Sequence, residues 1–150
     1  MDEINQKILT MLQENAKTTY AELAKATGMA PSGVMDRIRR LERRGYIAGY
    51  TTILKPSKLN LNLLAFVAVK TPNNWSDNAA KAMAALPNVL EVHEITGEDA
   101  YLLKIRSTGT EHLSYIIKNQ LGAIEEVVST QSTIVLNSLK ETSILPVEQG

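Results

Sequence analysis

Residues 19–44 of the sequence carry the pattern of two short helices joined by a tight turn. Thr19-x-x-Glu22 is a capping box, in which two side chains satisfy backbone N–H groups left free at a helix start. Gly28 can adopt the left-handed conformation that ends a helix and turns the chain. Pro31 suits the first turn of the next helix, where its missing N–H costs nothing. The stretch therefore predicts a helix, a turn and a second helix.

The second of these helices is strongly two-sided over residues 31–44. At about 100° per residue its apolar side chains fall on one face and most of its arginines on the other. The apolar face holds Val34, Ile38 and Leu41, and the opposite face holds Ser32, Asp36, Arg39, Arg40 and Arg43. Gly45 ends the helix, and residues 46–54 read as a hairpin wing turning near Gly49. A helix that docks on one side and is basic on the other predicts a winged helix-turn-helix that reads DNA.

Charge supports this placement, because it is uneven along the chain although the formal net charge of the 150 residues is +0. Residues 1–55 carry nine Lys and Arg against six Asp and Glu, whereas residues 56–150 carry seven against ten. The chain has no cysteine, which excludes disulfides and zinc sites that need sulfur. The first residues do not resemble a signal sequence, and the longest apolar run, Leu63–Val69, is too short to span a membrane. We expect a soluble cytoplasmic protein without membrane contact.

Two domains are predicted: a DNA-binding domain over residues 1–54 and a second domain over 63–150, separated by a linker at 55–62. A first helix starts at Asp2 or Glu3, and Lys55-Pro56-Ser57-Lys58 breaks the helical pattern. The second domain reads as strand, helix, strand, strand, helix, strand, at about 63–71, 76–86, 89–95, 101–107, 110–121 and 127–139. This order predicts an α+β, ferredoxin-like βαββαβ sandwich with both helices on one face of the sheet.

The other face of that sheet needs a cover, so we expect a dimer. The strand at 89–95 is predicted to alternate, with Val89, Glu91, His93 and Ile95 on one face and Leu90, Val92 and Glu94 on the other. Small polar residues on the last strand would suit a partner sheet or a ligand: Ser129, Thr130, Ser132 and Thr133.

Three segments carry a resemblance to a known family. They are Met29–Ile47 followed by Gly49-Tyr50-Thr51, the opening Asp2–Leu9, and Thr96-Gly97 followed by Tyr101–Lys104. In order and spacing the chain resembles the Lrp/AsnC (feast/famine) transcription regulators. The resemblance implies an N-terminal winged helix-turn-helix and a C-terminal effector (RAM) domain of the ferredoxin-like shape. It also implies dimers that often assemble to octamers, and an amino-acid effector bound near the turn after the second effector-domain strand.

The chain departs from the family's pattern at two positions. Ala30 stands where the family often has a serine, so a side-chain helix cap worth about 1 kcal/mol is missing. Ala100 stands where the family often has aspartate in Gly-x-x-Asp-Tyr, and Glu98 and Asp99 could substitute for it. The resemblance implies effector-binding candidates at this turn: Gly97, Glu98, Asp99, Ala100 and Tyr101, of which Tyr101 either lines a pocket or packs against a partner sheet. On the last strand, Thr130 and Ser132 either contact the ligand or are ordinary strand residues.

The candidates for DNA contact lie on the two helices of the predicted motif: Thr19, Tyr20, Ser32, Gly33, Asp36, Arg37, Arg39, Arg40 and Arg43. Asp36 either accepts a hydrogen bond from a cytosine amine or pairs with Arg40 at i+4, and the ion pair is favoured. Thr18, Thr19 and Tyr20 either hold a phosphate at the helix start or only cap the helix.

The prediction for function is a sequence-specific regulator of transcription that binds double-stranded DNA and responds to an amino acid or similar metabolite through its assembly. The alternative is a DNA-organising protein of the same fold without an effector, which Ala100 keeps open. Some relatives decarboxylate sirohaem, but here the second domain offers only His93, His112 and Arg106. We expect no enzyme, no cofactor and no metal site.

Overall fold

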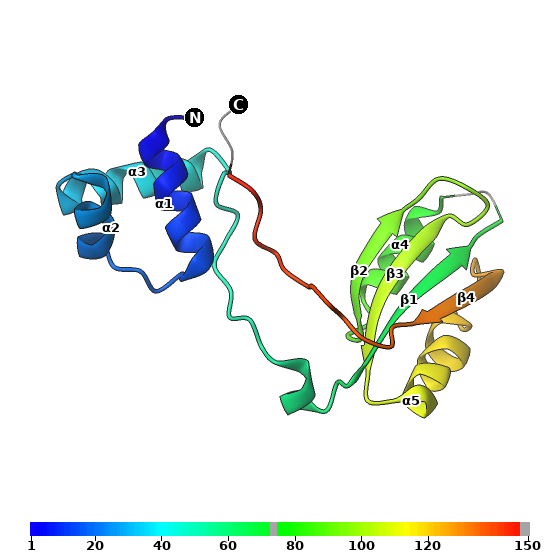
Figure 1. Ribbon diagram of the computed structural model, residues 1–150. Coiled ribbons are helices and arrows are strands. Elements are labelled where there is room, and N and C mark those ends of the chain that lie inside the picture. Colours follow the sequence, from blue (N-terminus) through cyan, green and yellow to red (C-terminus); the bar gives the residue numbers. More distant parts are fainter. Residues whose placement is uncertain (73–74, 148–150) are drawn as a thin grey trace. The chain divides into compact units, whose positions relative to one another are not determined.

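A computed structural model describes residues 1–72 and 75–147, and the chain divides into two compact units (Figure 1). The first unit comprises residues 1–53 together with the tail that begins at Lys140, and the second comprises Leu54–Leu139. The predicted division assigned that tail to the second domain. The predicted linker contains one 3₁₀ turn, η1 (Pro56–Leu59), after which Asn60 takes a positive φ of 57°.

Three helices form the first unit: α1 (Glu3–Glu14), α2 (Tyr20–Thr27) and α3 (Pro31–Arg43). Their boundaries are those of the sequence signals. The capping box of Thr19 and Glu22 is present, and Gly28 ends α2 at φ 70°. Ala30 precedes α3 without a side-chain cap, as its methyl group dictates.

The core of the first unit is small, and inward-facing apolar residues of all three helices form it. Its buried members are Ile8, Leu23, Ala24, Val34, Ile38 and Leu41. Full burial of a side chain as large as Leu or Ile contributes about 1.5–3 kcal/mol. The apolar face predicted for α3 therefore packs into this core and attaches the helix to the rest of the unit.

The predicted hairpin at 46–54 is not formed, because these residues make no strand pairing. A two-residue hairpin turn needs positive φ, and Gly45, at φ 75°, takes that conformation at the end of α3 instead of Gly49. The backbone N–H of Tyr46 then donates to Leu41 O at 2.9 Å, and the Tyr50 hydroxyl donates to Glu42 Oε1 at 2.9 Å. These bonds hold the segment along α3 rather than in a hairpin.

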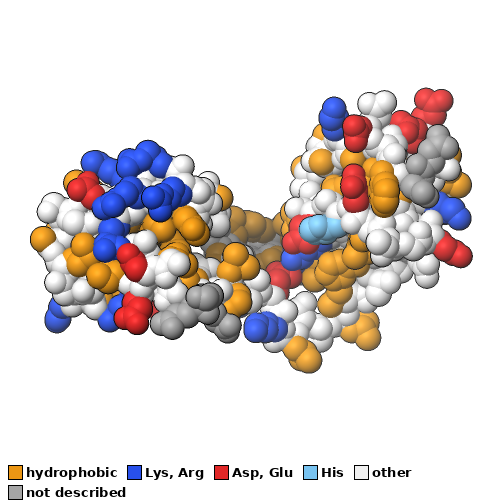
Figure 2. Space-filling model, turned by 90° about the horizontal axis from the view of Figure 1, so that it is seen from above, with side chains coloured by type: hydrophobic (Ala, Val, Ile, Leu, Met, Phe, Trp, Pro, Cys, Tyr) orange, Lys and Arg blue, Asp and Glu red, His pale blue; other side chains and the backbone are white. Residues whose placement is uncertain are grey.

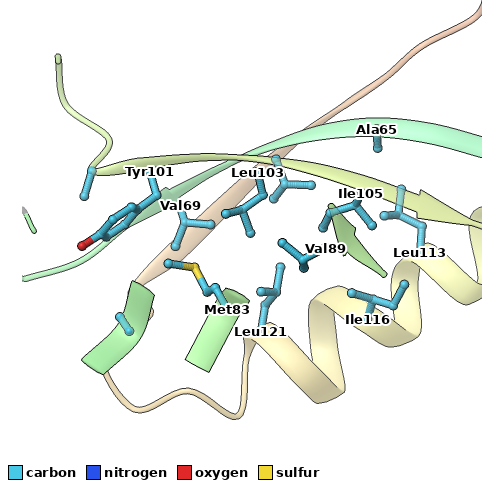
Figure 3. Close-up of a cluster of buried hydrophobic side chains, with 13 residues drawn as sticks. Ala65, Val69, Met83, Val89, Tyr101, Leu103, Ile105, Leu113, Ile116 and Leu121 are labelled. Carbon is cyan, nitrogen blue, oxygen red and sulfur yellow. The ribbon is translucent and has the colours of Figure 1, made fainter. Parts of the chain in front are cut away.

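The second unit has the predicted order of elements. Its strands are β1 (Leu63–Lys70), β2 (Val89–Glu94), β3 (Tyr101–Ser107) and β4 (Ser129–Ile134), and its helices are α4 (Asp77–Ala84) and α5 (Thr110–Tyr115), which continues as a π-helical turn, η2 (Ile116–Leu121). The strands are antiparallel in the order β2-β3-β1-β4, the ferredoxin-like arrangement. Figure 3 shows side chains of β1 and β3, among them Val69 and Leu103, meeting Met83 of α4 and Ile116 of η2. Both helices thus cover the same face.

The prediction of simple alternation in β2 was wrong. The pairing with β3 shifts between Val89 and Glu91, so that Val89 faces Ile105 and Val92 faces Leu103. One extra residue in a strand moves all later side chains to the opposite face. The bulge therefore puts Val89 and Val92 together against the core and leaves Leu90 exposed.

The last strand is shorter than the predicted 127–139. Val135 N–H donates to Leu64 O at 2.9 Å, and β1 begins only one residue earlier, at Leu63. Because β4 is at the edge of the sheet, β1 is its one neighbour. Residues 135–139 therefore leave the sheet and lead into the tail.

Candidate nucleic-acid interface and effector region

The candidate nucleic-acid interface is the exposed side of α3. Val34, Ile38 and Leu41 are buried, and Gly33 is half-buried. The predicted outward face is exposed at Ser32, Asp36, Arg39, Arg40 and Arg43, and Arg44 after the helix is exposed as well. Figure 2 shows Lys and Arg side chains gathered on one face of the first unit. Cationic side chains on a docked helix can meet the phosphates of a duplex.

The arginines of this face are available for a ligand. Within residues 1–72 and 75–147, no carboxylate pairs with Arg39, Arg40, Arg43 or Arg44. The predicted ion pair between Asp36 and Arg40 is wrong, because Arg40 Nε donates to the backbone O of Asp36 at 3.4 Å. A pair this exposed would gain at most about 1 kcal/mol, which does not ensure that it forms.

Arg37 differs from its neighbours and points toward α1. Its Nη1 atom lies 2.6 Å from Asp2 Oδ2 and 2.9 Å from Asn5 Oδ1, and its side chain is 24% exposed. The hydrogen bond from Arg37, followed by that from the Asn5 N–H, lowers the pKa of the Asp2 carboxyl. The sequence grouped Arg37 with the DNA-facing arginines. It carried no signal for Asp2 and Asn5, because the contact joins residues more than thirty positions apart.

Thr19 performs the capping role that was one of its two predicted roles. Its Oγ1 accepts the N–H of Glu22 at 3.2 Å, and its own N–H donates to Glu22 Oε2 at 2.7 Å. The bond from the Thr19 N–H, and after it the bond from the Thr19 hydroxyl to Glu22 Oε2 at 2.9 Å, lower the pKa of the Glu22 carboxyl. Tyr20, the first residue of α2, has a ring that is 47% exposed. A phosphate at this helix start would have to approach the Glu22 carboxylate.

The predicted effector turn is the tip of the β2–β3 hairpin. Gly97 has φ 113°, which glycine alone adopts easily. Gly97 and Glu98 are exposed and Asp99 is half-buried. Ala100, in contrast, is 3% exposed, and its N–H donates to Val69 O at 2.9 Å. Within this unit Ala100 is therefore a core residue.

Tyr101 is also a core residue. Its ring is fully buried and lies beside Val69 in Figure 3. Its hydroxyl accepts the N–H of Ser76 at 2.7 Å and donates to Ser76 O at 3.0 Å. Ser76 is the N-cap of α4, so Tyr101 fixes the start of that helix. Tyr101, predicted as an effector-binding candidate, thus has a structural contact within this unit.

Thr130 and Ser132 lie at the same end of the sheet as the turn, but on the face that the helices occupy. Thr130 pairs with Val69, which pairs on its other side with Tyr101. Two strand spacings, about 10 Å, therefore separate Thr130 from Tyr101. Ser132 pairs with the buried Val67, so these two side chains do not face the open side as expected; the register places Ser129 and Thr133 there.

The histidines have local partners. His93 Nε2 lies 3.1 Å from Glu91 Oε2, and His112 Nδ1 accepts the N–H of Thr108 at 3.3 Å. In the part of the chain that is described, no three His, Asp or Glu side chains gather as a metal site would require. No helix there is both long and apolar enough to cross a membrane.

Comparison with known families matches both units of the chain. A family described as winged helix-turn-helix DNA-binding matches residues 1–48. A family described as the Lrp/AsnC ligand binding domain matches residues 64–145, more than half of the chain.

Several characterised proteins resemble the chain over almost its whole length. It is 36% identical to the HTH-type transcriptional regulator FL11 of Pyrococcus furiosus, covering 99% of this chain and 97% of that protein. It is 31% identical to the leucine-responsive regulatory protein of Salmonella typhimurium, covering 99% and 92%. Among solved structures, a transcriptional regulator of Neisseria meningitidis in complex with L-methionine is 33% identical, covers 98% and 97%, and superposes with a TM-score of 0.92. The AsnC protein of E. coli is 28% identical, covers 97% and 99%, and has a TM-score of 0.87.

Proposed function

The chain belongs to the Lrp/AsnC family of DNA-binding transcriptional regulators, and from that premise we propose that α3 recognises a specific sequence in double-stranded DNA. One observation carries the proposal. The helix is docked through Val34, Ile38 and Leu41, while the exposed arginines of its other face have no carboxylate partner among the described residues. Its relatives are regulators, and we propose no catalytic role.

We propose different roles along the helix. Ser32, Gly33 and Asp36 lie in its first half, the part of a recognition helix that approaches base edges. Arg39, Arg40 and Arg43 follow toward its end, where they would contact phosphates or guanine. Thr19 and Tyr20 would lie close to the backbone of the duplex, with Thr19 already engaged in its cap. A bidentate arginine–guanine contact contributes about 1–3 kcal/mol of discrimination.

We further propose that the protein acts as a homodimer that assembles to an octamer. Phe66, Ala68 and Leu102 are only half-buried on the sheet face that carries no helix, and a second copy would cover them. The octamer follows from the family resemblance. A dimer would bind two half-sites separated by whole helical turns of about 10–10.5 base pairs.

An amino acid is the effector that we propose. Support comes from the ligand-binding family that matches residues 64–145 and from relatives of Neisseria meningitidis and Mycobacterium tuberculosis whose structures contain L-methionine. Gly97, Glu98 and Asp99 remain as candidates at the hairpin tip, and the two carboxylates suit an ammonium group. The buried Ala100 brings no acid to this turn, which favours as second candidate a DNA-organising protein without an effector.

Selection of binding sites from random duplex DNA tests the DNA proposal. The Arg43→Gln variant is then measured on a selected site. If Arg43 reads a base, specific binding should weaken about 5- to 150-fold. If Arg43 contacts a phosphate, the slope of log affinity against log salt should fall by about 0.9 per protomer. Lys118→Gln removes one exposed positive charge from the second unit and should change neither quantity. Unchanged binding by Arg43→Gln would remove this residue from the interface.

A thermal-shift screen of the twenty amino acids, followed by light scattering, tests the effector proposal. A ligand stabilises the state that it binds, so an effector should raise Tm and change the particle mass. Glu98→Gln and Asp99→Asn should reduce that response if the hairpin tip holds the ammonium group. Absence of any stabilising amino acid would favour the effector-independent alternative.

A further inference from the structure

Arg37 is the one arginine of α3 that has a carboxylate partner in residues 1–72 and 75–147. We infer that Arg37 is a positioning residue for DNA recognition, which Asp2 and Asn5 hold against the start of α1, and that it does not contact DNA. The inference rests on the proposed DNA-binding function and assigns a role to residues at the very start of the chain.

The contact joins three groups in one network. Arg37 Nη1 donates to Asp2 Oδ2 at 2.6 Å and to Asn5 Oδ1 at 2.9 Å. The other oxygen of the same carboxylate, Asp2 Oδ1, accepts the N–H of Asn5 at 2.8 Å and caps α1. A single carboxylate therefore begins one helix and anchors the middle of another. Charge-assisted bonds of this kind are short and directional.

Among the described residues, no other side chain of α3 makes a hydrogen bond to α1 or α2. Val34, Ile38 and Leu41 attach the helix through apolar contacts, which are non-directional and tolerate small rotations and shifts. Base readout, in contrast, requires several side chains to meet base edges at hydrogen-bond distance together. A polar clamp between α3 and α1 restricts the rotation of α3 and thereby keeps that set of side chains aligned.

Charge argues against a phosphate contact for the same side chain. Arg37 lies at the positive end of the α1 dipole, where a cation is unfavourable unless an anion compensates it. Asp2 supplies that anion. Its carboxylate would repel a DNA phosphate that approached the same guanidinium. Asp2, Asn5 and Arg37 line a cleft of about 270 Å³, whose lining also includes Arg40 and Arg44. Those two arginines remain available for DNA.

The test compares Arg37→Gln, Asp2→Asn and the double variant, for a selected site and for scrambled DNA across a range of salt concentrations. Asn is as good an N-cap as Asp, so Asp2→Asn removes the charge while keeping the start of α1. Asp77→Asn is the matched control, because Asp77 is the acidic first-turn residue of α4 in the second unit. Melting temperatures confirm that each variant is folded.

Each single variant should lower the ratio of specific to non-specific affinity about three- to tenfold, the effect of losing one partly exposed charged hydrogen bond. The salt slope of Arg37→Gln should stay at the wild-type value. The double variant should be no worse than the singles, because both changes break one network. Asp77→Asn should leave the ratio unchanged.

Two results would overturn the inference. If Arg37→Gln weakens specific and non-specific binding in parallel and the salt slope falls by about 0.9 per protomer, Arg37 contacts a phosphate. If the affinity ratio stays at the wild-type value in all three variants, the clamp does not position α3 for DNA. Failure of the proposed function looks different, since the wild-type protein would then prefer no DNA sequence, and the inference would fail with it.

Discussion

At the scale of single residues, neighbouring groups set the chemistry of side chains near α3. Tyr50 is the clearest case, because its hydroxyl donates to Glu42 Oε1 at 2.9 Å although the residue is 53% exposed. Partial burial of the phenol, and after it the Glu42 carboxylate, raise the pKa of Tyr50 to about 12. Loss of the phenolic proton would put two anions side by side, so the folded unit favours the neutral form.

A titration of tyrosine absorbance tests this contact. The folded pKa of Tyr50 is raised above its usual 10.0, so the stabilisation is complete below about pH 10 and is lost as the pH rises toward 12. Tyr50→Phe should therefore remove the latest-ionising phenol from the absorbance titration. Tyr115→Phe, at an exposed site in the second unit, should leave that late step in place. A late step that survives Tyr50→Phe would assign the raised pKa to another phenol.

At the scale of elements, the helices of the first unit differ in how their starts are satisfied. Asp2 caps α1 and Thr19 caps α2, each by accepting a backbone N–H. The recognition helix lacks such a bond, because Ala30 occupies its N-cap position. Pro31 compensates in part, since it has no N–H to satisfy and its φ suits the first turn.

Ala30→Ser should stabilise the first unit by about 1 kcal/mol, the usual contribution of a side-chain cap. The backbone at Ala30 already has the extended conformation of an N-cap, with φ −71° and ψ 146°, so no rearrangement is required. Urea unfolding measures the change, and Ala30→Val serves as the control because its side chain cannot accept a hydrogen bond. A serine variant no more stable than the valine variant would contradict the prediction.

Gly122, at the end of η2 in the second unit, is a position where a substitution should destabilise the protein, because little space is left there. A Cβ added at Gly122 would lie 2.6 Å from Lys118 O, a backbone atom of the π-helical turn η2. Gly122→Ala should therefore destabilise the second unit by about 1–3 kcal/mol, the range for forced overpacking. Gly49 lies in the first unit, where an added Cβ would meet nothing within 4 Å. Gly49→Ala should therefore change the unfolding midpoint of the second unit little. Equal midpoints for both variants would show that the turn can relax.

At the scale of the whole molecule, the chain passes from one unit to the other twice, since the tail beyond Leu139 belongs with the first unit. Gln13 Nε2 donates to Leu145 O at 3.0 Å, and Leu145 N–H donates to Gln13 Oε1 at 2.8 Å. One amide side chain of α1 thus pairs with an extended backbone as a neighbouring strand would. Each such bond contributes about 0.5–1.5 kcal/mol, so the docking is reversible.

Gln13→Glu keeps the shape of the side chain but replaces the donor to Leu145 O by an anionic oxygen. The backbone amide of Leu145 should then exchange its hydrogen about 2- to 10-fold faster, as expected for the loss of one or two exposed hydrogen bonds. Gln6→Glu makes the same chemical change on the same helix and should leave this exchange rate unaltered. Equal exchange of Leu145 in all three proteins would show that Gln13 does not hold the tail.

Local interactions explain why much of the architecture could be predicted from the amino-acid sequence. The Thr19 and Glu22 capping box, the positive φ of Gly28 and the apolar face of α3 depend on residues within a few positions of one another. The same holds for the order of strands and helices in the second unit. Such features depend on residues that are close together in the sequence, and the family resemblance added the expectation of an effector site at the turn near Gly97.

Contacts between distant segments account for the predictions that were wrong. The predicted ion pair between Asp36 and Arg40 is not formed, and neither the contact of Arg37 with Asp2 nor the burial of Ala100 and Tyr101 could be read from the sequence. The bulge in β2, the missing hairpin and the docked tail likewise depend on which segment lies opposite. Side-chain type and spacing specify what a residue can bind. Which of several possible partners it meets is decided by the packing of segments that are far apart in the sequence, and so only by the tertiary structure.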